Sequence, residues 1–183
     1  MQIIVISDLT DRIVLTGLVG KRLFPVLAER VNRSEEPQAL FLDFKGVTAS
    51  GSFFGQTLRQ FREYALGFNL YPVMCNINDE TAEELQWFTE VTPDAFVVCR
   101  LDDDQKISEP HWLGVLEEKQ RLTFEAVVKE KETDAGSLSR KYESEQIGIT
   151  GWNNRLSSLA AKGLIAEFKN GRSKKYRPVL ENW

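Results

Sequence analysis

Four short stretches dense in apolar residues constrain the fold more than any other feature of the chain. They lie at residues 2–9, 39–44, 70–75 and 95–101. A strand with one face in water alternates apolar and polar side chains, whereas a strand covered on both faces is almost continuously apolar. The four stretches therefore predict a covered sheet in the first half of the chain.

Helical patterns separate these strands. Residues 17–31, 52–67 and 79–90 carry apolar side chains three or four positions apart, as in helices with one buried face. Strands that alternate with helices predict an α/β layer structure containing at least one parallel pair of strands. The turn between residues 45 and 51 precedes the second helix and exposes backbone amides, but it lacks the spacing of a P-loop.

An acidic stretch after the fourth strand marks the predicted end of the first domain. Asp102, Asp103 and Asp104 are followed by Gln105 and Lys106, and such residues add nothing to a core. We expect an α/β regulatory domain over residues 1–106 and a second domain over residues 107–183. Beyond the boundary, the sequence predicts a helix over residues 108–132, with Ser108 as its cap and Pro110 in its first turn.

Composition narrows the class of protein. The 183 residues contain no apolar run near the roughly 20 residues that cross a bilayer, which predicts no membrane partner. The first residues lack the pattern of a secretion signal, so we expect a cytoplasmic protein. Cys75 and Cys99 lie in β-like apolar stretches without a CxxC partner, and this predicts buried thiols rather than a disulfide or a metal pair.

Charge is unevenly distributed along the chain. The formal net charge is −4, but residues 1–108 hold ten Lys and Arg against 16 Asp and Glu. Residues 138–178 reverse this balance, with nine basic side chains against three acidic ones. A phosphate responds to charge within about one Debye length, so the basic region indicates where nucleic acid would bind.

The last 50 residues predict two helices and a hairpin. The helices span residues 134–142 and 150–162, and Gly163 follows the second as a helix-ending glycine. Strands at residues 164–169 and 174–179 flank Asn170 and Gly171, a dipeptide that favours a type I′ turn. With the preceding helix, this is the element order of a winged helix-turn-helix domain.

The second of these helices has one polar face without acidic residues. Trp152, Leu156 and Leu159 share the opposite side, which we expect to pack on the domain. A small polar face can enter the major groove, while basic side chains of the hairpin contact the DNA backbone or the minor groove. The predicted DNA-binding residues are Thr150, Gly151, Asn153, Asn154, Arg155, Ser158, Arg172, Lys174 and Lys175.

The segment WNNRLSSLAAKGLIAEFKNGRSKKY resembles the recognition helix, glycine-capped turn and wing of the winged helix-turn-helix superfamily of bacterial transcription regulators. The resemblance covers about residues 113–179. It implies double-stranded DNA as the partner and, by analogy with regulators that read two half-sites, a homodimer. The alternative is a fold that packs only against another protein, with its lysines in solvent.

The segment ALFLDFKGVTASGSFFGQTLRQF is similar to the STAS-like family, which is related to anti-sigma factor antagonists. The resemblance covers about residues 3–90 and implies regulation through a protein partner, with phosphorylation of a serine at the start of a helix. Ser52 is the nearest match and Ser50 its neighbour. The chain has Ser-Gly-Ser-Phe where the antagonists have Asp-Ser-Ser-Gly, and the alternative role of Ser52 is a plain helix cap.

Nothing in the sequence indicates catalysis. His111 is the single histidine, and no nucleophile or metal-ligand pattern accompanies it, so we expect no enzyme activity, no cofactor and no metal. The leading hypothesis is a transcription regulator that binds DNA and whose STAS-like domain senses a protein, a phosphorylation or a small ligand. The alternative is a partner-switching signalling adaptor that uses both domains to bind proteins.

Overall fold

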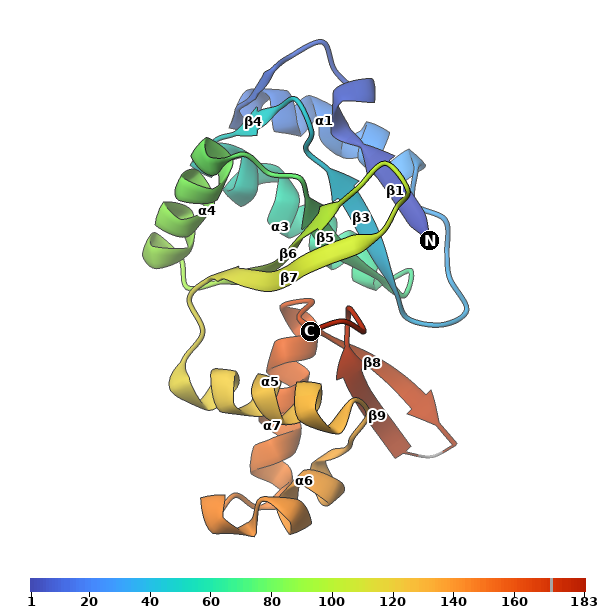
Figure 1. Ribbon diagram of the computed structural model, residues 1–183, viewed down its shortest axis with the longest axis vertical. Coiled ribbons are helices and arrows are strands. Elements are labelled where there is room, and N and C mark those ends of the chain that lie inside the picture. Colours follow the sequence, from blue (N-terminus) through green and yellow to red (C-terminus); the bar gives the residue numbers. More distant parts are fainter. Residues whose placement is uncertain (172) are drawn as a thin grey trace.

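The computed structural model describes residues 1–171 and 173–183, and the chain is a mixed α/β protein with two lobes (Figure 1). The N-terminal lobe comprises residues 1–114 and contains a five-stranded mixed sheet. The C-terminal lobe begins at residue 115 and contains helices and a β-hairpin. The two lobes share one of the two hydrophobic cores.

The sheet confirms the expected α/β arrangement. Its strands, in spatial order, are β1 (Gln2–Val5), β3 (Gln38–Asp43), β5 (Leu70–Cys75), β6 (Ala95–Leu101) and β7 (Ile107–Gly114). The first four strands are parallel, and β7 is antiparallel to β6. A second small sheet pairs β2 (Val14–Leu15) with β4 (Thr48–Ala49), and β1 continues into a 3-10 turn, η1 (Ile6–Asp8).

Helices cover one face of the sheet, as Figure 1 shows above the strands. They are α1 (Gly17–Glu29), α2 (Gly51–Phe53), the π-helical segment η2 (Phe54–Leu58), α3 (Arg59–Leu66) and α4 (Asp79–Val91). Leu40, Leu42 and Met74 point to this side and share its core with Phe53 and Phe61. Gly20 brings α1 against η2, because a Cβ at Gly20 would lie 1.9 Å from the hydroxyl oxygen of Thr57.

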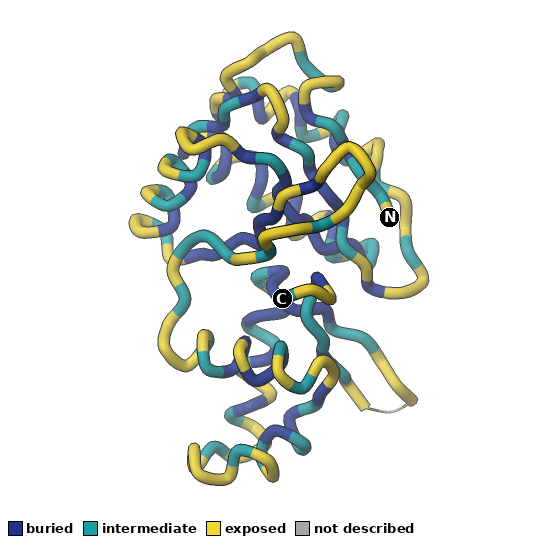
Figure 2. The backbone as a smooth tube through the Cα atoms, in the orientation of Figure 1, coloured by how far each residue is buried: buried dark blue, intermediate teal, exposed yellow. Residues whose placement is uncertain are grey.

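The C-terminal lobe covers the other face of the same sheet. It contains α5 (Glu118–Glu130), α6 (Ala135–Lys141), η3 (Glu143–Glu145), α7 (Ile149–Ala161), β8 (Ile165–Asn170) and β9 (Ser173–Pro178). Phe41, Val73 and Val97 alternate with the residues that face the helices, and they share a buried core with Leu159 and Ile165 of this lobe. Figure 2 shows buried segments on both sides of the boundary between the lobes. The continuously apolar strands are thus covered on both sides.

A buried carboxylate links the two lobes. Asp94 is 3% exposed and accepts two hydrogen bonds from the Arg62 guanidinium, at 2.8 and 3.2 Å. Arg59 lies 3.3 Å from the same carboxylate, and Lys162, just after α7, lies 3.6 Å from it. Gly163 follows with a φ of +73°, and a Cβ there would lie 3.2 Å from the Arg62 side chain. The predicted glycine end of α7 is confirmed, and it packs on this cluster.

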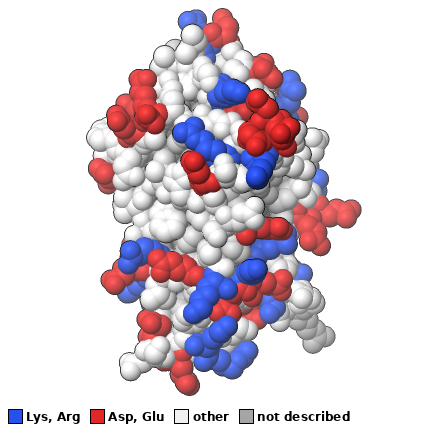
Figure 3. Space-filling view, viewed as in Figure 1, with Lys and Arg blue, Asp and Glu red and all other residues white. Residues whose placement is uncertain are grey.

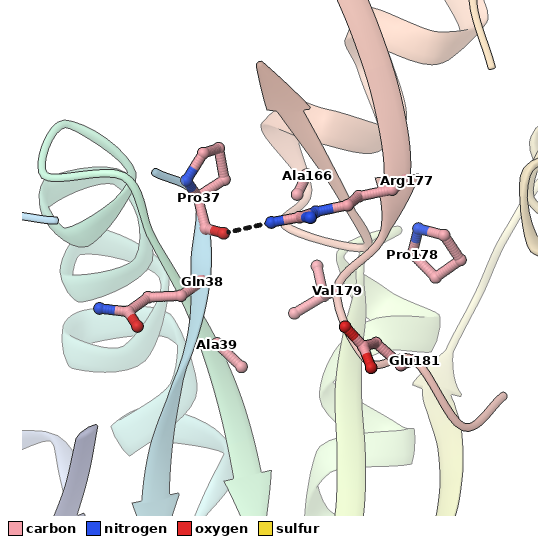
Figure 4. Close-up of a pocket in the computed structure, with 8 residues that line it drawn as sticks. All are labelled: Pro37, Gln38, Ala39, Ala166, Arg177, Pro178, Val179 and Glu181. Carbon is pink, nitrogen blue, oxygen red and sulfur yellow. Dashed lines mark hydrogen bonds between the residues drawn. The ribbon is translucent and has the colours of Figure 1, made fainter. Parts of the chain in front are cut away.

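Two further polar contacts join the lobes at the opposite end of the boundary. The backbone N–H of Glu167 donates to the Tyr71 hydroxyl at 2.9 Å. Arg177 donates to the carbonyl oxygen of Pro37, also at 2.9 Å, beside a pocket of about 170 Å³ (Figure 4). Burial raises the pKa of Tyr71, so its hydroxyl keeps its proton while its oxygen accepts this hydrogen bond.

The predicted helix over residues 108–132 is wrong in its first half. Residues 107–114 form β7, which follows β6 through a turn in which the Lys106 N–H donates to Asp102. Pro110 and Ser108 therefore lie in an edge strand, and α5 begins at Glu118 with Glu117 in a capping box. The division predicted after Lys106 passes through this β-hairpin, so the sheet extends to Gly114.

The hairpin turn is also shifted from its prediction. Asn170 pairs with Ser173 as the last residue pair of the ladder, and Gly171 has a φ of +62°. The turn therefore begins after Asn170, one position later than the expected Asn-Gly pair.

Asp94→Asn tests the link between the lobes. The substitution keeps the side-chain volume but leaves Arg62 buried without its opposite charge, so we expect the free energy of unfolding to fall by about 3–5 kcal/mol. Urea denaturation measures this change. As a control, Asp103→Asn removes the exposed ion pair with Lys45 and should cost less than about 1 kcal/mol. Equal losses in the two variants would contradict the structural role of Asp94.

Cys75 and Cys99 provide a second test, since both thiols lie under the C-terminal lobe. They are free, buried and directly paired across β5 and β6, with their sulfur atoms 3.9 Å apart, which confirms the prediction of buried thiols. The hydrogen bond with Cys99 and burial raise the pKa of Cys75. We expect neither thiol to react with a soluble thiol reagent in the native protein, and both to react at one rate on unfolding. Rapid native labelling, measured by mass spectrometry, would contradict this arrangement.

Candidate nucleic-acid interface

The N-terminal half of α7 extends away from the sheet and exposes three of the predicted DNA-binding residues. Thr150, Asn153 and Asn154 are exposed in the first turns of the helix. The helix contains no acidic residue, and its buried side chains, Trp152 and Leu156 among them, face the lobe's core as expected. The three side chains are polar and uncharged, and this half of α7 lies near α6, on the side of the lobe away from the sheet (Figure 1).

Two predicted residues lie off this surface. A Cβ at Gly151 would lie 2.9 Å from the side chain of Ile147, so this position faces the turn that precedes the helix. Ser158 is half-buried, and its hydroxyl accepts a hydrogen bond at 3.0 Å from Gln120 of α5. Helical periodicity places both on the polar face, whereas in the structure Ile147 lies against Gly151 and Gln120 of α5 contacts Ser158.

Arg155 also lies at the edge of the exposed surface. Its guanidinium stacks on the ring of Trp152 at 5.7 Å from the ring centre, and the residue is half-buried. Stacking holds the charge close to the helix while leaving donors for an anion.

The predicted lysines of the hairpin are already in contact with carboxylates. Lys174 lies 2.7 Å from Glu167 on the neighbouring strand, and Lys175 lies 2.6 Å from Asp134, the N-cap of α6. The hydrogen bond from Lys175 lowers the pKa of Asp134, and the bond to Glu167 raises the pKa of Lys174. Arg172, the third predicted residue of this group, lies outside the described residues.

Other cations of the basic region are engaged as well. Lys141 contacts Glu130 at 2.5 Å, Lys162 contacts Asp94, and Arg177 donates to a backbone carbonyl. Within residues 1–171 and 173–183, Arg140 and Lys169 have no carboxylate within ion-pair distance. Figure 3 shows basic and acidic side chains interspersed on this face of the C-terminal lobe. The net positive charge counted from the sequence is therefore partly neutralised inside the lobe.

The serines of the N-terminal lobe have a role different from the expected cap. No side chain caps α2, and the Ser52 hydroxyl instead accepts from the backbone N–H of Gly17, the first residue of α1, at 2.9 Å. Ser50 donates to the carbonyl of Leu15 and lies 3.0 Å from Ser52. Ser50 and Ser52 thus join α2 to the start of α1.

A carboxylate already occupies the start of α2. Glu84 of α4 accepts a hydrogen bond at 2.6 Å from the N–H of Gly51. Glu84 was not predicted from the sequence, because it lies 33 residues after Gly51 and only the fold brings it to this position. A phosphate on Ser52 would add negative charge at the start of α2, where the Glu84 carboxylate already lies.

Comparisons with known proteins add no family to these observations. No family model matches the chain, and no curated protein matches it in sequence. Among the helices of the described residues, none has the length and apolar character needed to cross a membrane. The same residues contain no group of three or more His, Cys, Asp or Glu side chains placed to hold a metal.

Lys175→Gln tests the contact between the hairpin and α6. Without the lysine, the pKa of Asp134 should rise toward the ordinary value of about 3.9, which a carboxyl NMR titration measures. Because this pKa is lower in the folded chain than in the unfolded one, the contact stabilises the fold at neutral pH. That contribution disappears as the pH falls from the unfolded pKa through the folded one.

Lys174→Gln is the matched control, since Lys174 contacts Glu167 and should leave the titration of Asp134 unchanged. An Asp134 titration insensitive to both substitutions would show that the ion pair does not persist in solution.

Proposed function

We propose that the chain is a DNA-binding transcription regulator with a C-terminal winged helix-turn-helix domain and a STAS-like N-terminal domain. The observation that carries the proposal is the exposed, acid-free first half of α7 beside a projecting hairpin. The order α5, α6, α7, β8 and β9 corresponds to three helices and a wing. In this assignment α7 is the recognition helix.

The proposed contacts fall into two classes. Asn153 and Asn154 have amides that can pair with base edges in the major groove, and Thr150 lies beside them. Arg140, Lys169 and the two hairpin lysines contact phosphates, which position the helix without selecting a sequence. Lys174 and Lys175 exchange Glu167 and Asp134 for phosphate on binding. Gly151 and Ser158 support the helix rather than touch DNA.

The role of the N-terminal domain follows from its connection to α7. Asp94 holds Lys162 at the C-terminal end of the helix that we assign to recognition. A protein, a phosphorylation or a small ligand that alters the N-terminal lobe would act on α7 through this contact. We propose that the N-terminal lobe senses one of these signals.

A second candidate function is the signalling adaptor that binds only proteins. The observation in its favour is a set of apolar side chains exposed on the N-terminal lobe: Ile13, Val14, Leu18, Trp87 and Val91. Trp87 is 62% exposed, and a Cβ on Gly51 would lie 3.4 Å from its ring, so it lies close to Ser50 and Ser52. Exposed aromatic side chains are typical of protein interfaces.

The double substitution Asn153→Asp with Asn154→Asp tests DNA binding. It places two carboxylates on the exposed face of α7, where they would meet bases and phosphates, and both side chains are already exposed in the free protein. We expect affinity for double-stranded genomic fragments to fall by more than about tenfold in a mobility-shift titration. Lys169→Glu should weaken binding to all fragments and reduce the salt dependence.

Lys21→Glu is the matched control. It reverses an exposed charge on α1, in the other lobe, and should leave DNA affinity unchanged. Absence of wild-type binding at low salt would refute the proposed regulator. Retained capture of a protein partner by the α7 variants, without any DNA binding by the wild type, would favour the adaptor.

A further inference from the structure

The two edges of the five-stranded sheet differ in how they are protected. Strand β7, at one edge, contains Pro110, has Glu109 at a φ of +52°, and pairs with β6 through a register shift between Val98 and Arg100. A proline, a charged residue and a bulge are the devices by which proteins prevent an edge strand from pairing with another chain. These features of its own sequence prevent β7 from pairing with a strand of another chain.

Strand β1, at the other edge, has none of these devices. Its residues are uncharged, contain no proline and pair regularly with β3 on one side only. Ile3 and Val5 are half-buried, and a groove of about 320 Å³ follows the outer side of the strand. An uncharged, regular and open edge offers backbone hydrogen bonds to a further strand.

The ends of this groove carry opposite charges. Arg30, after α1, lies at the start of β1, where its carbonyl accepts a hydrogen bond from the Gln2 side chain. Asp8, in η1, follows the other end of the strand. Both residues are exposed, and neither forms an ion pair with any described residue. The groove is therefore basic at one end and acidic at the other.

We propose that β1 pairs with β1 of a second copy of this chain, antiparallel and about a two-fold axis. A two-fold axis perpendicular to the sheet places Ile4 opposite Ile4, and Ile3 opposite Val5 of the second copy. The basic end of each groove then meets the acidic end of the other. Arg30 of each copy therefore lies beside Asp8 of the other copy. This charge match selects a second copy over an unrelated strand.

The pairing joins two sheets into one of ten strands and removes the open edge. It leaves the hairpin and the exposed half of α7 free in each copy, because β1 lies on the N-terminal lobe (Figure 1). The dimer goes beyond the proposed function and does not depend on it, since the pairing is measured without DNA.

Sedimentation equilibrium of the purified full chain tests the proposal. A dimer has twice the chain mass of 20.9 kDa, and we expect it at protein concentrations up to about 100 µM, where a micromolar Kd is observable. Arg30→Glu and Asp8→Arg should each weaken association at least tenfold, because like charges then face each other. The double variant Asp8→Arg with Arg30→Glu restores opposite charges and should restore the dimer.

Arg22→Glu is the matched control, as it reverses an exposed charge on α1, the helix that Arg30 follows, and it should leave the mass distribution unchanged. Circular dichroism verifies that each variant is folded. The proposal is overturned if the wild-type chain remains monomeric at all of these protein concentrations. This holds whether the β1 edge pairs with a strand of another protein or with no strand. Two other results also overturn it. One is single variants that dimerise as tightly as Arg22→Glu, and the other is a double variant that dimerises as weakly as the single variants.

Discussion

The buried carboxylate of Asp94 is the contact on which the arrangement of the two lobes depends. It satisfies Arg62, which would otherwise be a buried cation, and it accepts the Ala95 N–H at 2.8 Å. Arg62 in turn stacks on Phe96 and packs against Gly163. One side chain, directly before β6, thereby holds α3 of the N-terminal lobe and the end of α7 together. A buried carboxylate persists only when cations and donors surround it, so this geometry is tightly defined.

This contact gives α7 two ends with different environments. Its last residues and Gly163 are fixed on the sheet, and its middle contributes Trp152, Leu156 and Leu159 to the core shared by both lobes. In its first turns the opposite side of the helix, with Ile149, Thr150, Asn153 and Asn154, is exposed, and Ile149 is 59% exposed. The helix therefore runs from the Asp94 contact to the proposed recognition surface. A change in the N-terminal lobe that moved Lys162 would reach that surface along α7.

The sequence contains enough to predict most elements, and the misses have specific causes. Apolar density identified β5 and β6 with the observed bounds, and Gly163 marked the end of α7. Residues 107–114 were missed because Ser-Glu-Pro is typical of a helix start, whereas pairing with β6 over a long ladder outweighs that local preference. The site was predicted in part: the exposed residues of α7 follow from helical periodicity. The partners Glu167, Asp134 and Glu84 do not, since each comes from another element.

Those partners change how charge would act in the proposed interface. Lys169 can contact a phosphate without losing an ion pair. Lys174 must first release Glu167, and the Glu167 carboxylate then lies near the same phosphate. The gain from each paired lysine is the difference between two ion pairs, and exposed ion pairs are individually weak. One lobe therefore presents few effective phosphate contacts. In the proposed function, such a surface would gain affinity from amide contacts to bases and from two copies acting together, as in the proposed pairing of β1 edges.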